Sequence, residues 1–301
     1  MDYLLVFLSV ILLSLGFVLQ KFYQKKAGPW GAASFSLYTA ICSILSLTII
    51  NGVQFEFSWY SLINAALRSL CVFLYTLVGF HIMNRGCMAL YMLFLMSGGM
   101  LLPVLWGWIF LDEPVAPMRV LGVLTIVFAM ILTRDKEEKA DTIMITCLLA
   151  VFFLNGMTSV FAKLHQINEV YETVSTTPYA IYSSLTSLLL SSITKAIRSK
   201  KQEKADTTVK HPKNMPGAES LKSSLLLIGI VIIYSVLASI SNILQLEGAK
   251  TLDASVLYPI ITGGTVVFTG IMALIFYGEK PSKREWISIG LCLAGTFMFL
   301  E

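Results

Sequence analysis

The sequence contains little charge. Only 13% of its 301 residues are Asp, Glu, Lys or Arg, about half the fraction found in an ordinary soluble domain. The net charge of +4 is small and sits in the segments between apolar blocks, so a nucleic-acid-binding surface is not expected. Hydrophobic residues make up 56% of the chain and the mean hydropathy is +0.76. Because the apolar blocks approach the roughly 20 residues that a membrane-spanning helix needs, the sequence predicts an all-α integral membrane protein.

Cysteine and histidine are also scarce. The five cysteines show no spacing typical of a metal site or a disulfide framework and are expected to be small packing residues. The three histidines, His81, His165 and His211, are expected on scattered loops. No glycine loop followed by Lys-Ser or Lys-Thr is present, so ATP binding within this chain is not expected. We therefore expect no metal, no cofactor and no catalytic residues.

The apolar blocks predict ten transmembrane helices. Pro103 and Pro259 are expected to interrupt the fourth and the ninth helix, which a bundle tolerates when neighbours satisfy the freed backbone groups. The one long connection, 195–222, is rich in lysine and is expected to be a flexible basic loop. The predicted helices are Tyr3–Leu19, Trp30–Ile50, Trp59–Phe80, Met88–Leu111, Pro117–Leu132, Ile143–Val160, Val174–Ile193, Ser223–Leu244, Ala254–Phe276 and Ser282–Leu300.

The second half of the chain repeats motifs of the first half. The segment LQKFYQ at 19–24 aligns with FAKLHQ at 161–166, and MSGGMLLP at 96–103 aligns with ITGGTVVF at 261–268. The pair Glu113-Pro114 corresponds to Glu279-Lys280-Pro281. Residues 1–134 and 142–301 are therefore interpreted as two copies of a five-helix unit. Since five is odd, the copies are expected to have opposite orientations, as in many secondary transporters.

These motifs resemble a known family. The lysine-bearing ends of the first and sixth helices resemble the EamA-type branch of the drug/metabolite transporter superfamily. So does the pattern formed by Gly278, Glu279, Gly290, Leu293, Ala294 and Gly295. The resemblance is strongest in the last two helices. It is weaker in the first half, where Asp112-Glu113 replaces Gly-Glu. It implies a ten-helix transporter of small organic metabolites, with both termini in the cytoplasm.

The loop charges indicate the other orientation. Eighteen Lys and Arg residues lie in or beside the connections that follow the first, third, fifth, seventh and ninth helices. Only Arg119, Lys163 and Lys250 lie toward the opposite side. Cytoplasmic loops carry the excess of positive charge, so the charge count predicts that both termini face outward from a plasma membrane.

Arg68 is the main candidate for substrate binding, because it is the cation that lies deepest within a predicted span. A charge at that depth is retained only beside a partner, water or a ligand. An anionic or carboxylate-bearing substrate would satisfy it, and so would carbonyl oxygens of neighbouring helices. Both interpretations are open from the sequence. Polar residues at helical spacing, and at equivalent places in the second half, extend the candidate site to Asn64, Tyr75, Tyr234, Ser235, Asn242 and Tyr258.

Four charged residues near helix ends are candidates for gating or ion coupling. Lys21 and Lys163 are equally explained as lysines that reach the membrane interface. Glu113 and Glu279 are better explained as acids that serve the loop and the start of the following helix. A coupling ion, H⁺ or Na⁺, is compatible with either pair, and the protein is expected to be a monomer or a homodimer.

The sequence favours a secondary transporter of a small polar organic metabolite that works by alternating access. A membrane-embedded enzyme acting on lipid would need a cluster of acids, histidines or cysteines at the membrane face, and the sequence suggests none. A channel or a scaffold is the third alternative, and the internal repeat disfavours it without excluding it.

Overall fold

The structure, a computed structural model, describes residues 2–27, 31–54, 56–83, 88–132, 142–206, 218–278 and 283–299. These ranges contain ten α-helices and no β-strand, which confirms the all-α class. The helices are α1 (Asp2–Ala27), α2 (Gly31–Ile50), α3 (Trp59–Met83), α4 (Met88–Phe110), α5 (Pro117–Leu132), α6 (Thr142–Gln166), α7 (Thr176–Asp206), α8 (Ala218–Thr251), α9 (Ala254–Tyr277) and α10 (Lys283–Phe297).

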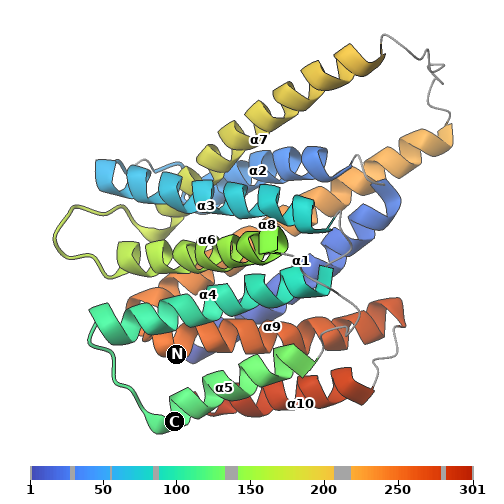
Figure 1. Cartoon of the computed structure of the whole chain (residues 1–301). Coiled ribbons are helices and arrows are strands. Elements are labelled where there is room, and N and C mark those ends of the chain that lie inside the picture. The colour runs from blue at the N-terminus through green and yellow to red at the C-terminus, as the bar shows by residue number, and fades with distance from the viewer. Residues whose placement is uncertain are drawn as a thin grey trace.

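Within the described residues, six helices are long and apolar enough to cross a membrane: α1, α3, α4, α6, α8 and α9. Shorter apolar stretches occupy 35–50 in α2, 117–132 in α5 and 286–297 in α10. The six long helices lie in the middle of the bundle, with α2 and α7 along one side and α5 and α10 along the opposite side (Figure 1). The protein is therefore a multi-pass membrane protein with a central group of long spans.

Helix contacts recur at an interval of five helices. The contact of α4 with α6 matches that of α9 with α1, and the contact of α1 with α8 matches that of α6 with α3. The contact of α3 with α7 likewise matches that of α8 with α2. Three helices contact their own counterparts directly, in the pairs α2–α7, α4–α9 and α5–α10. Most of the packing thus joins one half of the chain to the other.

Glycines at the centre of α4 and α6 allow these two helices to approach closely. A Cβ atom on Gly98 would collide with the carbonyl group of Phe152, and one on Gly156 would lie 2.7 Å from the carbonyl oxygen of Gly98. In the second half, a Cβ on Gly264 would lie 3.0 Å from Val10 of α1. Gly98 and Gly264 therefore lie against helices of the other half, as small residues do in membrane helix interfaces, whereas Gly263 lies closest to Thr296 of α10 in its own half.

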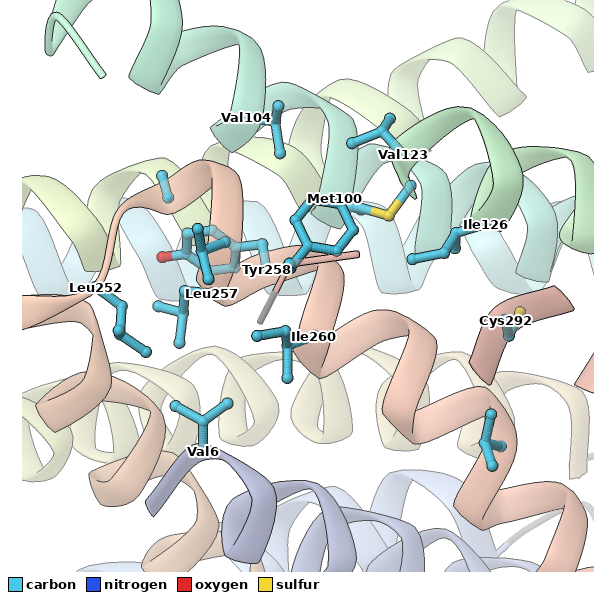
Figure 2. Close-up of a cluster of buried hydrophobic side chains, with 14 of the residues drawn as sticks. Val6, Met100, Val104, Val123, Ile126, Leu252, Leu257, Tyr258, Ile260 and Cys292 are labelled. Carbon is cyan, nitrogen blue, oxygen red and sulfur yellow. The ribbon is translucent and has the colours of Figure 1, made fainter. Parts of the chain in front are cut away.

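The largest apolar cluster lies among α4, α5, α8, α9 and α10, with Val6 of α1 packed against it (Figure 2). Met100, Ile126 and Cys292 are fully buried in it. Cys292 acts here as a small packing residue, as expected. Figure 2 also shows the ring of Tyr258 among these apolar side chains.

Two details differ from the sequence-based expectation. The prolines Pro103 and Pro259 lie inside continuous helices, so they do not divide α4 or α9. In addition, α7 continues to Asp206 and α8 begins at Ala218, so helix occupies both ends of the interval 195–222 that was expected to be a loop. Residues 207–217 lie outside the described residues.

The α4–α6 contact provides a test of the packing. The change Gly98→Ala adds one methyl group directly against backbone, which cannot give way as a flexible side chain can. We expect it to lower stability by about 1–3 kcal/mol, the usual effect of overpacking. The matched control is Gly229→Ala in α8, where nothing lies within 4 Å of the added Cβ and alanine favours the helix. Thermal unfolding in detergent compares the two variants, and equal midpoints would contradict the packing.

Candidate functional site

Arg68 of α3 lies at the interface between the two halves. One terminal nitrogen, Nη2, donates a hydrogen bond of 3.0 Å to Oδ1 of Asn242 in α8. Its guanidinium carbon lies 5.9 Å from the centre of the Tyr179 ring in α7, within the range of a cation–π interaction. The structure thus joins two of the predicted site residues, Arg68 and Asn242, and adds Tyr179 as a third.

The guanidinium of Arg68 is not fully satisfied by the protein. Its Nε is buried and has no hydrogen-bond partner. Within the part of the chain that the structure describes, no carboxylate forms an ion pair with it. A buried polar group without a partner is unfavourable by about 1–3 kcal/mol, and more when it is charged. Arg68 therefore presents a positive charge and a free donor inside the bundle.

Asn64 and Tyr179 support the position of this charge. The hydroxyl of Tyr179 donates a hydrogen bond of 2.8 Å to Oδ1 of Asn64, one turn of α3 before Arg68. Both side chains are buried, so the bond is shielded from competing solvent. It joins α7 to α3 and fixes the ring on which the guanidinium lies. Tyr179 is not among the binding residues predicted from the sequence, because a single tyrosine in a helix carries no distinguishing pattern.

His165 lies beside the same ring. Its ring centre is 3.8 Å from that of Tyr179, and the two planes differ by 21°. Nε2 lies 2.9 Å from Oγ of Ser61, and Nδ1 lies 3.1 Å from Nε2 of Gln166. The expectation that this histidine belongs to a loop is wrong, because α6 continues to Gln166 and buries the imidazole almost completely. The motif FAKLHQ ends inside the helix and not before it.

The other predicted binding residues have different partners. The hydroxyl of Ser235 donates to the carbonyl groups of Val231, at 2.7 Å, and Thr39, at 3.3 Å, so it links α8 to α2. The ring of Tyr234 packs against Phe35 with centres 4.9 Å apart. Tyr258 donates to the carbonyl of Ser159 at 2.6 Å. Ser235 aligns with Arg68 when Leu90-Tyr91 is matched to Leu257-Tyr258, but its hydroxyl bonds to backbone carbonyls and not to Arg68.

A second polar cluster surrounds the two-residue turn between α8 and α9. Glu113 accepts backbone N–H bonds from Ala254, at 2.6 Å, and Ser255, at 2.9 Å, so it caps the start of α9. The carboxylate requires Gly107 beneath it, because a Cβ there would collide with it. The expectation that Glu113 serves the helix that follows it is corrected: it serves α9 of the other half. A carboxylate at a helix N-terminus is stabilised by the helix dipole.

Lys163 and Arg119 complete this cluster. Nζ of Lys163 donates to the carbonyl oxygens of Ala249, at 2.9 Å, and Leu252, at 2.6 Å, at the end of α8. Arg119 of α5 forms an ion pair of 2.7 Å with Asp253. The turn is thus held on both sides by charged groups. Lys163 is buried and does not reach outward as an interface lysine would.

Lys21 and Glu279 correspond in the repeat to Lys163 and Glu113. Nζ of Lys21 lies 4.9 Å from the centre of the Tyr277 ring, whose hydroxyl donates to the carbonyl of Val18 at 2.7 Å. Glu279, the counterpart of Glu113, lies outside the described residues. Lys21 therefore contacts α9, a helix of the other half.

The comparison with protein families identifies the chain. The profile of the EamA-like transporter family matches residues 142–300, which is more than half of the sequence. The chain belongs to the EamA-like transporter family. The match covers the second half, where the motif resemblance was strongest, and it confirms the resemblance seen in the sequence. Members of this family are membrane transporters.

The fold of this EamA-like transporter is shared with a solved crystal structure. That protein is 15% identical, the alignment covers 99% of this chain and 95% of the other, and the TM-score is 0.72. At this identity the similarity shows the fold alone. None of the curated protein sequences matches the chain.

The cap on α9 can be tested with Glu113→Gln. Glutamine has one oxygen where glutamate has two, so one of the two backbone N–H groups would face an amide NH₂ group instead of an acceptor. We expect a loss of about 1–3 kcal/mol, the effect of one unsatisfied buried donor. The control is Glu169→Gln in the α6–α7 connection, where the side chain is exposed. A Glu113→Gln midpoint equal to that of the control would show that the cap is dispensable.

Proposed function

We propose that this EamA-like transporter is a secondary active transporter of a small polar organic anion, with Arg68 binding the anionic group. The observation that carries the proposal is the unsatisfied guanidinium: Nε is buried without a partner, and no carboxylate among the described residues neutralises the charge. An arginine fork is suited to a carboxylate or phosphate, because its donors lie in one plane at matching spacing.

The energetic balance supports a ligand over a structural role. Removing an unpaired charge from water is unfavourable by several kcal/mol, and one charge-assisted hydrogen bond to the neutral amide of Asn242 recovers only about 1.5–3 kcal/mol of it. The aromatic contact with Tyr179 adds about 0.5–2 kcal/mol. The remaining deficit is one that a bound anion can offset. A purely structural arginine would be expected to use all of its donors.

Phenol groups near Arg68 support a substrate that carries further polar groups besides its anionic group. Electrostatic interactions connect Tyr75 with both Arg68 and Tyr234. The two tyrosines belong to opposite halves, in α3 and α8. A substrate held by Arg68 can therefore donate to or accept from hydroxyls of both halves.

The arrangement of the helices supports alternating access. The contacts recur at an interval of five, and the paired helices meet their own counterparts. Two five-helix units that meet in this way, with a site between them, are the architecture in which one unit rocks against the other. We propose that residues 1–134 and 142–301 are these units in opposite orientations, with ten spans in all. The coupling ion is proposed to be H⁺ or Na⁺, and the protein a monomer or homodimer.

Substitution of Arg68 tests anion binding. A library of amino acids, nucleosides, sugars and organic acids is first screened by thermal shift on the purified protein, and each stabilising compound is then assayed for transport in proteoliposomes. Arg68→Gln keeps hydrogen bonding and similar bulk but deletes the charge. It should weaken binding by about 2–5 kcal/mol, or roughly 30-fold or more. Arg68→Lys should recover only part of the loss, because an ammonium lacks the planar fork.

Transport by the variant is compared with that of the unchanged protein at equal amounts of protein in the membrane. If Arg68→Gln accumulates normally and transports as well as the unchanged protein, Arg68 is structural and the proposal is wrong. If the variant does not accumulate, the residue is needed for folding, and this too counts against a binding role.

The orientation is a separate proposal. We propose that both termini face outward, since eighteen loop cations lie on the opposite side and three on theirs. A single cysteine at position 301 and another at 212 are tested for labelling by a membrane-impermeant reagent in intact cells. We expect labelling at 301 and none at 212. The reverse result would place the termini in the cytoplasm, and equal labelling would contradict the odd number of spans, α8, α9 and α10, between the two sites.

A further inference from the structure

His165 is the buried histidine among the described residues, and imidazole is the side chain that most readily gains and loses a proton. Histidine changes charge between about pH 5 and 8. The buried carboxylate Glu113 is committed to two backbone N–H groups, and the buried ammonium of Lys163 is committed to two carbonyls. His81 is exposed at the end of α3. Among the described residues, His165 alone combines burial with an imidazole close to the proposed anion site.

The contacts of His165 define its present state. The amide nitrogen of Gln166 can only donate, so Nδ1 of His165 accepts, and the imidazole is neutral with its proton on Nε2. That proton is donated to Oγ of Ser61, which also accepts the backbone N–H of Val174 at 3.0 Å. Protonation would add a hydrogen to Nδ1. This nitrogen would then no longer accept from Gln166, and the ring would gain one positive charge.

The added charge would act on Arg68 through a shared ring. The imidazole stacks on Tyr179 at 3.8 Å, and the guanidinium lies 5.9 Å from the centre of the same ring. Between them there is no carboxylate among the described residues. Two cations on one aromatic ring repel each other unless an anion joins them, and in a low-dielectric interior this effect is strong.

The remaining groups that face His165 do not cancel this charge. Tyr60 of α3 stacks on it at 6.2 Å, and Tyr171 stacks on Tyr60 at 5.1 Å. From α8 the nearest ionic group is Lys250, a further cation, which is paired with Glu247 at 2.8 Å. The stretch of α4 from 91 to 110, which packs along α6, has no charged side chain. Arg68 is thus the one unpaired charge in this set.

We propose that His165 is the proton-binding residue of this transporter, and that a proton and the anionic substrate bind together, with His165 holding the proton and Arg68 the anion. This rests on the proposed function and names its coupling ion. The step balances: Nδ1 gains H⁺, the substrate contributes one negative charge, and the net charge of the site is unchanged. Because coupling between two binding events is reciprocal, the proton increases the affinity for the anion to the same extent that the anion increases the affinity for the proton.

The test is anion binding to the full-length protein in nanodiscs. The probes are acetate, benzoate and glutamate. Benzamide is the neutral match for benzoate. For a carboxylate that binds, the affinity should be up to about 100-fold higher near pH 5.5 than near pH 7.5, because one proton taken up per anion changes the affinity tenfold per pH unit. Calorimetry in two buffers of different ionisation enthalpy should show about one proton taken up per anion. His165→Gln should bind with equal affinity at both pH values and take up no proton, while His81→Gln should retain both effects.

The outcomes separate the two proposals. If a carboxylate binds the unchanged protein with no pH dependence and no proton uptake, and Arg68→Gln abolishes that binding, His165 is not the coupling site and the anion function stands. If none of the carboxylates binds, or if binding survives Arg68→Gln, the anion site is wrong and the coupling falls with it. Proton uptake is measured on the unchanged protein, so an unstable His165→Gln variant does not decide the result.

Discussion

The structure is organised around one positive charge inside a membrane bundle. A guanidinium at the level of Arg68 is tolerated only when surrounding groups replace the water it has lost. The protein provides one amide oxygen from Asn242 and one aromatic face from Tyr179, and leaves Nε without a partner. The other contacts of the site follow from this. Asn64 fixes Tyr179, His165 stacks on it, and the α3, α6, α7 and α8 segments that carry them must pack closely enough to shield the charge.

The two halves of the chain use the same packing for different chemistry. In the aligned motifs LQKFYQ and FAKLHQ, His165 corresponds to Tyr23. His165 stacks on Tyr179 of α7, while Tyr23 packs on Phe35 of α2 with ring centres 4.6 Å apart. A histidine–tyrosine stack in one half thus corresponds in the repeat to a tyrosine–phenylalanine contact in the other. The recurring helix contacts are compatible with the proposed rocking of one half against the other, and the difference in side chains limits the proposed anion site to one of the two equivalent positions. An internal repeat can thus retain matching helix contacts in both halves while only one half has a histidine at this position.

The sequence predicts the parts of this protein that depend on composition and spacing. The all-helical membrane class and the family follow from apolar blocks and from motifs around Lys163 and Gly278, and the family is confirmed. Arg68 could be selected because a charge within an apolar span is rare. Tyr179 and the helical position of His165 could not, because their roles arise from helices far apart in sequence. The same reason explains Glu113, which caps α9 across the interface and not the helix beside it: local sequence shows a capping acid without showing which helix it caps.

The central claim is that Arg68 is retained for a ligand and not for stability. The most direct measurement is the thermal unfolding of the ligand-free double variant Arg68→Met/Asn242→Leu, which replaces a buried hydrogen-bonded charge and its partner by apolar groups of similar size. A residue kept for binding reduces stability, and apolar replacement of buried ionic groups is often neutral or stabilising. We predict a midpoint equal to or higher than that of the unchanged protein. A midpoint lower by several degrees would show that the guanidinium holds the bundle together, and would contradict the account.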